Sequence, residues 1–253
     1  MPPTAEFSWR NASILIADDE PDMREIFAAW LRNLGCTVTE VSDGEEALNA
    51  LALQKFDAVV TDVRMPRLNG IQLVRRLKQS GEYIPVIIFV SGFVDLPLPD
   101  AYDLGVEAVL AKPCLRKELT GALCRSIQRR QLAFEPDLEV VKPGPEDDIR
   151  QNFVCAVDES TVAVGRGGVS LETGLEVAPG AATRFSLFFD QGPLRALHGW
   201  GVVRWCETVS QRVRAGIEFM DLGDDCRHDF ATWLQDASPS SFIPKERHSK
   251  PSR

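Results

Sequence analysis

The sequence predicts an α/β domain with a (βα)5 doubly wound parallel sheet, followed by a small antiparallel β-barrel with a C-terminal helix. Two observations carry this prediction. In the first half, short apolar runs alternate five times with segments of helical spacing. In the second half, apolar and polar residues alternate with a period of two, and glycine-containing turns separate the runs. The length of 253 residues also favours two domains.

The first half is read as five strand–helix repeats. The strands are continuous apolar runs, which is typical of a parallel sheet covered by helices on both faces. Ligands of such sheets bind beyond the carboxyl ends of the strands. The expected pairs are 13–19 with 21–35, 37–42 with 43–54, 57–63 with 70–80, 85–91 with a weaker helix before Gly105, and 108–113 with 115–131.

The second half changes to strands of period two, closed by a short helix at 224–236. In the last strand, Val213, Ala215, Ile217 and Phe219 share an apolar face, and Arg212, Arg214 and Glu218 share the opposite one. We expect the following division of the chain: 11–131 α/β domain, 132–149 linker rich in proline and acids, 150–236 β-barrel, and 237–253 disordered basic tail.

Composition excludes several classes of protein. No apolar run approaches the roughly 20 residues that span a bilayer, so we expect no integral membrane segment. The N-terminus has no apolar signal region, which favours a cytoplasmic protein. Residues 131–236 hold nine Lys and Arg against eighteen Asp and Glu residues, which disfavours DNA as a partner. The six cysteines are scattered without a zinc-type spacing.

Carboxylates follow two neighbouring strands of the expected sheet. Asp18 and Asp19 close the first strand and Asp62 closes the third, so the three side chains should crowd one edge. Their mutual repulsion favours a divalent cation, and hard oxygen ligands with room for water suit Mg²⁺. Ser91 and Lys112 close the fourth and fifth strands, where a hydroxyl and an ammonium can hold a phosphoryl group bound to an aspartate. Single acids at these positions could simply cap helices.

Residues 13–130 resemble a CheY-type receiver domain of a two-component response regulator. The likeness is carried by ADDE (17–20), TDVRMPRLNG (61–70), VSG (90–92) and AKP (111–113). It implies that Asp62 accepts a phosphoryl group from a histidine kinase or phosphotransfer protein. It also implies that Asp18, Asp19 and Asp62 bind Mg²⁺ with the backbone carbonyl of Arg64, while Ser91 and Lys112 contact the phosphoryl group.

Two departures from that family concern the residues that transmit the signal after phosphorylation, not the residues that accept the phosphoryl group. Val109 stands where the family usually carries Tyr or Phe. Pro97 and Pro99 would break an ordinary fourth helix. Since the family commonly uses that surface for contacts with partners or between two copies, we expect a remodelled output face.

Residues 150–236 are similar to the PilZ domain, a small barrel that in many bacterial proteins binds cyclic di-GMP. The likeness lies in GRGGVSLET, APGAATRFSLFF, HGWGVVRW and AGIEFMDL, in the family's order. The family's ligand motifs, RxxxR and DxSxxG, are degenerate here. Ala163 and Gly165 stand at the Asp and Ser positions, and Val154 stands where Arg150 should have its second arginine. Arg150 and Arg166 remain as weak candidates for contact with an anion.

The sequence therefore predicts a response regulator and not an enzyme, apart from the transfer and loss of the phosphoryl group at Asp62. Its PilZ-like output is expected to act on a downstream protein, and homodimer formation stays open. The alternative is a phosphorylation-gated effector that binds cyclic di-GMP. We expect such binding to be weak or absent. A dianionic ligand would lose its hydration on entering an acidic domain, and without the arginine pair it would gain few contacts to replace it.

Overall fold

A computed structural model of the chain describes residues 9–79, 84–92, 96–134, 151–156, 162–174, 176–189, 194–209, 212–237 and 241–245. These residues divide into two compact units. The α/β unit holds the described residues up to 97 and those of 106–131. The β-rich unit holds 98–105 together with the described residues from 132 onward. Residues 98–105 thus group with the β-rich unit, although the sequence places them inside the α/β domain.

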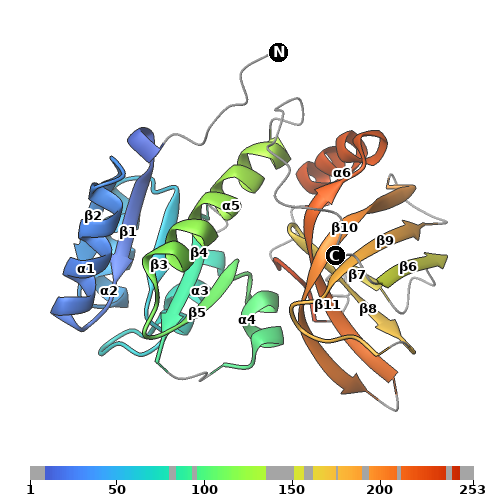
Figure 1. Cartoon of the computed structure of the whole chain (residues 1–253). Coiled ribbons are helices and arrows are strands. Elements are labelled where there is room, and N and C mark those ends of the chain that lie inside the picture. The colour runs from blue at the N-terminus through green and yellow to red at the C-terminus, as the bar shows by residue number, and fades with distance from the viewer. Residues whose placement is uncertain are drawn as a thin grey trace. The chain divides into compact units, whose positions relative to one another are not determined.

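Five parallel strands form the sheet of the α/β unit, in the order β2-β1-β3-β4-β5 (Figure 1). The chain runs outward from β1 to β2 and then crosses back to β3, which is the doubly wound order and leaves helices on both faces. The predicted strands are confirmed. Their bounds are β1 Ser13–Ala17, β2 Thr37–Val41, β3 Ala58–Thr61, β4 Val86–Ser91 and β5 Ala108–Ala111.

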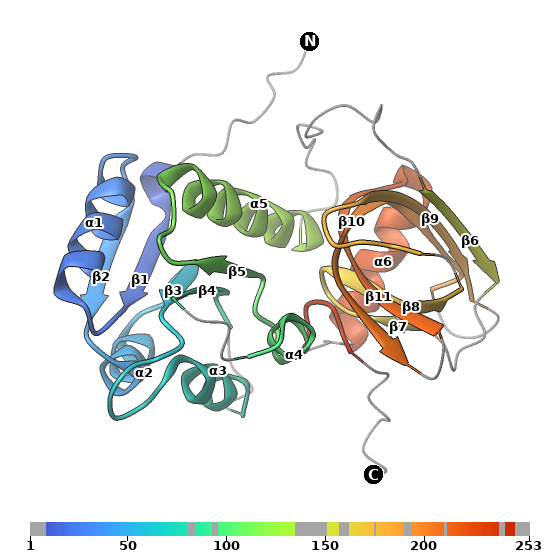
Figure 2. The same ribbon diagram turned by 60° about the horizontal axis from the view of Figure 1, so that its bottom comes forward.

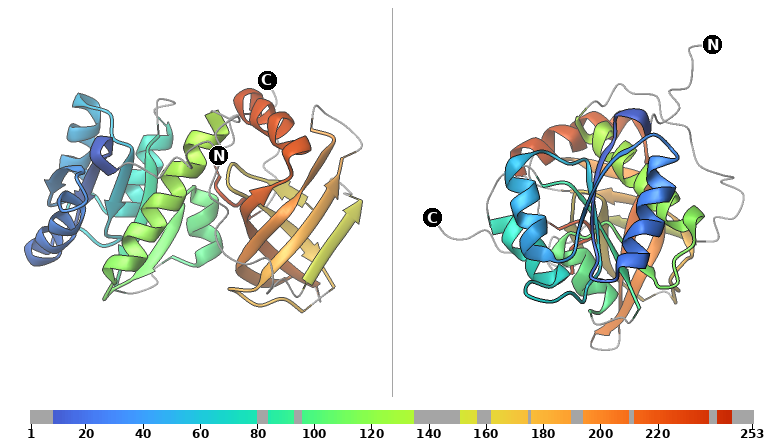
Figure 3. Two further views of the ribbon diagram at one scale, coloured as in Figure 1. Left: turned by 45° about the horizontal axis from the view of Figure 1, so that its top comes forward. Right: turned by 90° about the vertical axis from the view of Figure 1, so that its left-hand side faces the viewer.

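Four helices of 10 to 19 residues flank this sheet: α1 Pro21–Arg32, α2 Gly44–Leu53, α3 Gly70–Gln79 and α5 Arg116–Phe134. A short 3₁₀ turn, Trp9–Asn11, precedes β1. Phe27 and Leu31 of α1 share one buried cluster with Leu119 and Leu123 of α5, so these helices cover the same face. Helices α2 and α3 lie on the other face (Figure 3, right). None of the described helices is both long and apolar enough to cross a bilayer.

Six strands form the sheet of the β-rich unit, in the order β6-β9-β10-β11-β8-β7. Figure 2 shows that β10 and β11 are long and strongly curved, and two register shifts interrupt their pairing, one with its extra residue on β11 and one with its extra residue on β10. The bounds are β6 Gln151–Ala156, β7 Val162–Val164, β8 Gly168–Thr173, β9 Ala182–Phe188, β10 Ala196–Val209 and β11 Arg212–Leu222.

This sheet differs from the expected antiparallel barrel in two ways. Strand β6 runs parallel to β9, whereas the other four strand pairings of the sheet are antiparallel. Within the described residues, the two edge strands β6 and β7 are not paired with each other. The sequence shows that residues 151–156 form a strand, but period-two alternation does not reveal its direction.

Helix α6, Asp224–Ala237, packs on the curved sheet as the sequence predicts. Phe230 lies at the centre of this contact. Its ring meets Phe219 of β11 edge-on at 5.6 Å and stacks with Trp233 at 5.8 Å. The same cluster contains Phe185 and Ile217, so the apolar face predicted for the last strand is the core of the unit.

The opposite face of β11 carries a buried charge. Glu218 is only 4% exposed. Its carboxylate forms a salt bridge with Arg204 of β10. Alternation of apolar and polar residues with a period of two does not distinguish a charged side chain in solvent from one that is buried in a salt bridge. The salt-bridge partner here, Arg204, lies on another strand.

Helix α4, Leu98–Leu104, forms despite the two prolines that were expected to break it. Pro97 precedes the helix and Pro99 lies in its first turn, where a missing N–H removes no intrahelical hydrogen bond. Gly105 follows with φ of +92°, a backbone angle typical of helix ends. The prolines therefore fix the start of a short helix.

Part of the expected disordered tail is ordered. Ser241, Phe242 and Ile243 are 3%, 2% and 0% exposed. The average composition of 237–253, rich in serine, proline and basic residues, hides these two large apolar side chains. Helix α6 also extends to Ala237. The prediction of disorder is therefore wrong for 241–245, and residues 246–253 lie outside the described part of the chain.

Candidate functional site

The carboxyl ends of the parallel strands bring the five predicted side chains to one edge of the α/β unit. Asp18 and Asp19 follow β1, Asp62 follows β3, Ser91 ends β4, and Lys112 follows β5. Backbone hydrogen bonds continue the strand pairing into this edge, since Asp62 N donates to Ala17 O at 2.8 Å and Lys112 N donates to Ser91 O at 2.9 Å. The site is therefore built on strand ends, which hold side chains more rigidly than long loops do.

Lys112 lies at the centre of the site. Its Nζ donates to Asp62 Oδ2 at 2.6 Å and to Glu20 Oε1 at 3.0 Å. It also forms an ion pair with Asp18 Oδ2 at 2.9 Å. The side chains of Lys112, Asp18 and Asp62 are 12%, 2% and 8% exposed. One ammonium thus bridges three carboxylates, two of which are buried.

The backbone positions the two buried aspartates. Asp18 Oδ1 accepts from Glu20 N at 2.9 Å, and Asp62 Oδ1 accepts from Arg64 N at 3.0 Å. Each carboxylate is therefore held by one oxygen, while its Oδ2 faces Lys112. In addition, Arg24 Nη1 donates to the carbonyl of Asp18 at 2.6 Å and ties α1 to the end of β1.

Burial and charge shift the pKa values of this cluster. Burial raises the pKa of Asp18 above its ordinary value, and hydrogen bonds from Lys112 and from the backbone of Glu20 oppose that rise. Burial also acts to lower the pKa of Lys112, but its hydrogen bonds to Asp18, Asp62 and Glu20 outweigh burial and hold this pKa above the ordinary value. Lys112 therefore stays charged at physiological pH.

The cluster fits a divalent cation. One carboxylate oxygen from each of Asp18, Asp19 and Asp62 lies within 4.8 Å of the others. Asp18 Oδ2 is buried and lies 2.9 Å from the Lys112 ammonium. Three clustered carboxylates carry more negative charge than one lysine neutralises, and an all-oxygen set matches Mg²⁺. The carbonyl of Arg64 stays a prediction as a fourth ligand.

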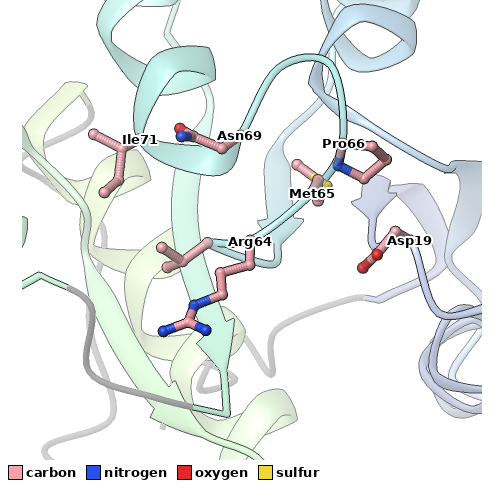
Figure 4. A pocket seen from close by; sticks show the side chains of 7 residues that line it. Asp19, Arg64, Met65, Pro66, Asn69 and Ile71 are labelled. Carbon is pink, nitrogen blue, oxygen red and sulfur yellow. The ribbon is translucent and has the colours of Figure 1, made fainter.

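A pocket of about 490 Å³ adjoins the aspartates. Figure 4 shows Asp19 on one side of it, with Met65 and Pro66 of the loop after β3 close by, and Asn69 and Ile71 near the start of α3 on the other side. Asp19 is exposed, so this pocket gives solvent and small solutes access to the acidic edge of the sheet.

Ser91 and Val109 lie where the strand assignment predicts. Ser91 is 7% exposed, and its neighbour in the sheet is Ala111 of β5. Val109 pairs in register with Phe89 on the same two strands. The aliphatic residue at 109 thus occupies a regular place in β5.

Sequence reasoning missed two features of this unit. Glu20 contacts Lys112, and the only signal is its place directly after the two aspartates. Asp43, the residue before α2, is fully buried, caps this helix by accepting from Glu45 N and Glu46 N, and forms a salt bridge with Arg67. Arg67 has a φ of +60°, which is uncommon outside glycine. No pattern in the sequence relates residues 43 and 67.

The two arginines proposed as anion contacts have different outcomes. Arg150 lies outside the described residues. Arg166 follows β7, and its Nη2 donates to Gly105 O at 2.7 Å. Its guanidinium also lies 5.4 Å from the ring centre of Phe242. Internal groups thus engage the guanidinium of Arg166.

Comparison with known proteins identifies the α/β unit. Residues 14–124 match the family described as the response regulator receiver domain. The response regulator MprA of a Mycobacterium species (strain KMS) is 32% identical over 154 residues, which are 61% of this chain and 63% of that protein. The regulator of RpoS of Escherichia coli K12 is 35% identical over 100 residues, 40% of this chain and 30% of that protein. The match thus spans less than two thirds of either relative.

Two solved structures are similar to part of this chain. A CheY-like receiver domain from Methylobacillus flagellatus is 31% identical, covers 46% of this chain and 98% of its own, and has a TM-score of 0.42. The receiver domain of a sensor histidine kinase from Pseudomonas aeruginosa PAO1, solved with magnesium in its active-site cleft, is 31% identical, covers 47% of this chain and 98% of its own, and has a TM-score of 0.42.

Proposed function

We propose that this chain, whose residues 14–124 form a response regulator receiver domain, accepts a phosphoryl group on Asp62 and passes the signal to its β-rich unit. The observation that carries the proposal is the bridge of Lys112 between Asp62 and Asp18, with Asp19 in the same cluster. A nucleophilic carboxylate, a cation beside it and an acidic metal cluster are the groups that phosphoryl transfer to an aspartate requires.

The proposed donor is the phosphohistidine of a histidine kinase or phosphotransfer protein. A carboxylate oxygen of Asp62 attacks phosphorus, an O–P bond forms and the N–P bond breaks. The released imidazole nitrogen keeps the electron pair and takes a proton from solvent. Lys112, already 2.6 Å from Asp62, neutralises charge on the new phosphoryl group, and the Ser91 hydroxyl is its second contact. Mg²⁺ held by Asp18, Asp19 and Asp62 would offset the charge of the phosphoryl oxygens.

Mass spectrometry tests this proposal. Incubation with acetyl phosphate and Mg²⁺ should add about 80 Da, the mass of one phosphoryl group, to the wild type. Asp62→Ala should gain nothing. Asp22→Ala, which removes an exposed carboxylate from the first turn of α1, should be labelled like the wild type. An unlabelled wild type, under conditions that label another receiver domain, contradicts the proposal.

The proposed output is a PilZ-like unit that acts on a downstream protein. The turn that would read a nucleotide in that family, Gly165–Gly168, uses its N–H groups internally: Gly165 N donates to Gly168 O, Arg166 N to Ser241 O and Gly167 N to Phe242 O. The guanidinium of Arg166 is also engaged. These contacts support a role in protein binding rather than in binding cyclic di-GMP.

Calorimetric titration separates this output from the alternative, a phosphorylation-gated cyclic di-GMP effector. We expect no saturable heat with the nucleotide at micromolar concentration, before or after treatment with acetyl phosphate. Micromolar or tighter binding in either state would replace protein binding with nucleotide binding as the proposed output. The assignment of Asp62 does not depend on this result.

A further inference from the structure

Residues Ser241–Lys245, which we call the clasp, lie between two parts of the β-rich unit that are far apart in sequence. On one side is the turn Gly165–Gly168, and on the other is helix α4. Arg166 N donates to Ser241 O at 3.1 Å and Gly167 N donates to Phe242 O at 3.0 Å. Phe242 N in turn donates to Tyr102 O of α4 at 3.0 Å. The clasp is therefore hydrogen-bonded through its backbone to both neighbours.

The clasp also closes an apolar cluster. Tyr102 of α4, Trp205 of β10, Phe242 and Ile243 are 6%, 2%, 2% and 0% exposed and pack together, with Leu98 against them. The rings of Tyr102 and Phe242 stack with centres 6.2 Å apart. This cluster is separate from the main core of the unit, and all its members except Trp205 belong to α4 or the clasp.

Polar contacts satisfy the C-terminal end of α4. The carbonyls in the last turn of a helix have no partner within the helix, and a nearby cation is favourable there. Here Tyr102 O accepts from the clasp, and Gly105 O, just after the helix, accepts from Arg166 Nη2. Asp103 accepts from Lys245 N at 3.0 Å and from Ser241 Oγ at 3.2 Å, and Lys245 Nζ pairs with Asp100 at 3.1 Å.

The glycines of the turn make room for the clasp. A Cβ atom on Gly167 would fall onto the ring of Phe242, and one on Gly165 would lie 2.6 Å from both Phe242 O and Pro244 Cδ. In contrast, a Cβ on Gly174, at the end of β8, would meet nothing within 4 Å. Glycine at positions 165 and 167 thus leaves the space that the clasp occupies.

We propose that the clasp holds helix α4 on the β-rich unit, so that α4 moves with that unit. We also propose that phosphorylation of Asp62 weakens the contacts between the clasp and α4, and this part rests on the proposed function. Ser91, the expected phosphoryl contact, is joined to Leu98 by the six residues 92–97. A change at Ser91 on phosphorylation would therefore lie only seven residues before the start of α4.

Hydrogen–deuterium exchange of the full-length chain tests the clasp without phosphorylation. In Gly167→Ala and in Phe242→Ala, amides of 98–104 should exchange at least about tenfold faster than in the wild type, because a buried aromatic contact is displaced or removed. Gly174→Ala should match the wild type. Strands 212–222 report whether each variant is folded. If Gly167→Ala also loses protection in 212–222, that variant is not folded and the test rests on Phe242→Ala. If Phe242→Ala is folded and its amides of 98–104 exchange as in the wild type, the proposal that the clasp holds α4 is wrong.

A second experiment tests the coupling. The wild type is treated with acetyl phosphate and Mg²⁺, and both its mass and its exchange are measured, with Asp62→Ala as the control. A gain of about 80 Da with faster exchange in 98–104 supports the coupling. The same gain with unchanged or slower exchange overturns the coupling but leaves the proposed function intact. If the mass does not change, the proposed function fails, and the clasp is judged from its variants alone.

Discussion

Lys112 holds together carboxylates that would otherwise repel one another. Its ammonium contacts Asp18, Asp62 and Glu20, and the first two are buried. A cation bound by the aspartates would add to this positive charge at short range. Lys112 and such a cation would therefore compete for the same carboxylates, although both would favour the proposed phosphorylated product.

This competition predicts opposite effects of one substitution. Lys112→Met should raise the affinity for Mg²⁺ by about tenfold, since an opposing charge a few ångströms away is removed. It should also slow phosphorylation by acetyl phosphate. Magnesium titration by calorimetry measures the first effect and the rate of mass gain the second. Lys117→Met, the same change on the exposed side of α5, should alter neither. Weaker magnesium binding in Lys112→Met would contradict the competition.

Cys36 predicts a pH dependence of stability. Burial, and then the charge of Asp57, raise the pKa of this thiol from its ordinary value of 9.0 to about 11. The unfolded chain loses the proton first, so the stabilisation is fully present below pH 9 and is lost between pH 9 and about 11. The loss should be about 2 kcal/mol. Urea unfolding across this range should show a shallower decline in Cys36→Ala than in the wild type, and an equal decline would disprove the assignment.

At the scale of elements, Asp43 links α2 to the loop after β3. Its side chain accepts from two N–H groups of α2 and pairs with Arg67. Asp43→Ala should destabilise the α/β unit by about 2 kcal/mol, because the cap is lost and Arg67 loses its buried partner. Asp22→Ala, in the first turn of α1, should cost far less. Urea unfolding followed by circular dichroism measures the free energy of unfolding of both variants. Equal losses of free energy would show that the contacts of Asp43 stabilise the unit no more than the exposed Asp22 does.

Strands β10 and β11 are joined by a buried charge pair, Arg204 with Glu218. Arg204→Met should destabilise the β-rich unit by about 3 kcal/mol, because an unpaired carboxylate is left buried. The double variant Arg204→Met/Glu218→Gln should recover part of that loss, since the amide carries no charge. Thermal unfolding measures all three proteins. A double variant less stable than Arg204→Met alone would contradict this explanation.

Most elements were predictable because each carries its own pattern. Apolar runs located β1 to β5, and the spacing of apolar residues located α1, α2, α3 and α5. The common location of Asp18, Asp19, Asp62, Ser91 and Lys112 follows from the strand ends, since parallel topology brings these ends to one edge of the sheet. What could not be predicted depends on contacts between distant residues. The direction of β6, the burial of Glu218 and the place of α4 are set by partners that no local pattern reveals.

At the scale of the whole molecule, the two units do not correspond to two continuous stretches of the sequence. Residues 98–105 belong by sequence to the receiver domain but by contact to the β-rich unit. The clasp explains this grouping, and composition hid it, because two apolar residues stand within a polar, proline-containing stretch.

A receiver fragment ending at residue 131 should therefore be incomplete. Leu98 and Tyr102 would lose the surface against which they pack. We expect amides of 98–104 to exchange at least about tenfold faster in the fragment than in the full-length chain. Amides of β1 and β3, which lie in the core of the α/β unit, should be equally protected in both. Equal exchange in 98–104 would show that the receiver domain alone orders this helix.

The hydrogen bond between Ser241 and Asp103 joins residues 138 positions apart. A ribosome adds about 5 to 20 residues per second, so α4 waits roughly 7 to 28 seconds for Ser241 to be synthesised. The sheet and the other helices of the α/β unit can form in that interval. Each newly made molecule thus passes through a period in which the carboxylate cluster around Lys112 can already be assembled while α4 still lacks the clasp.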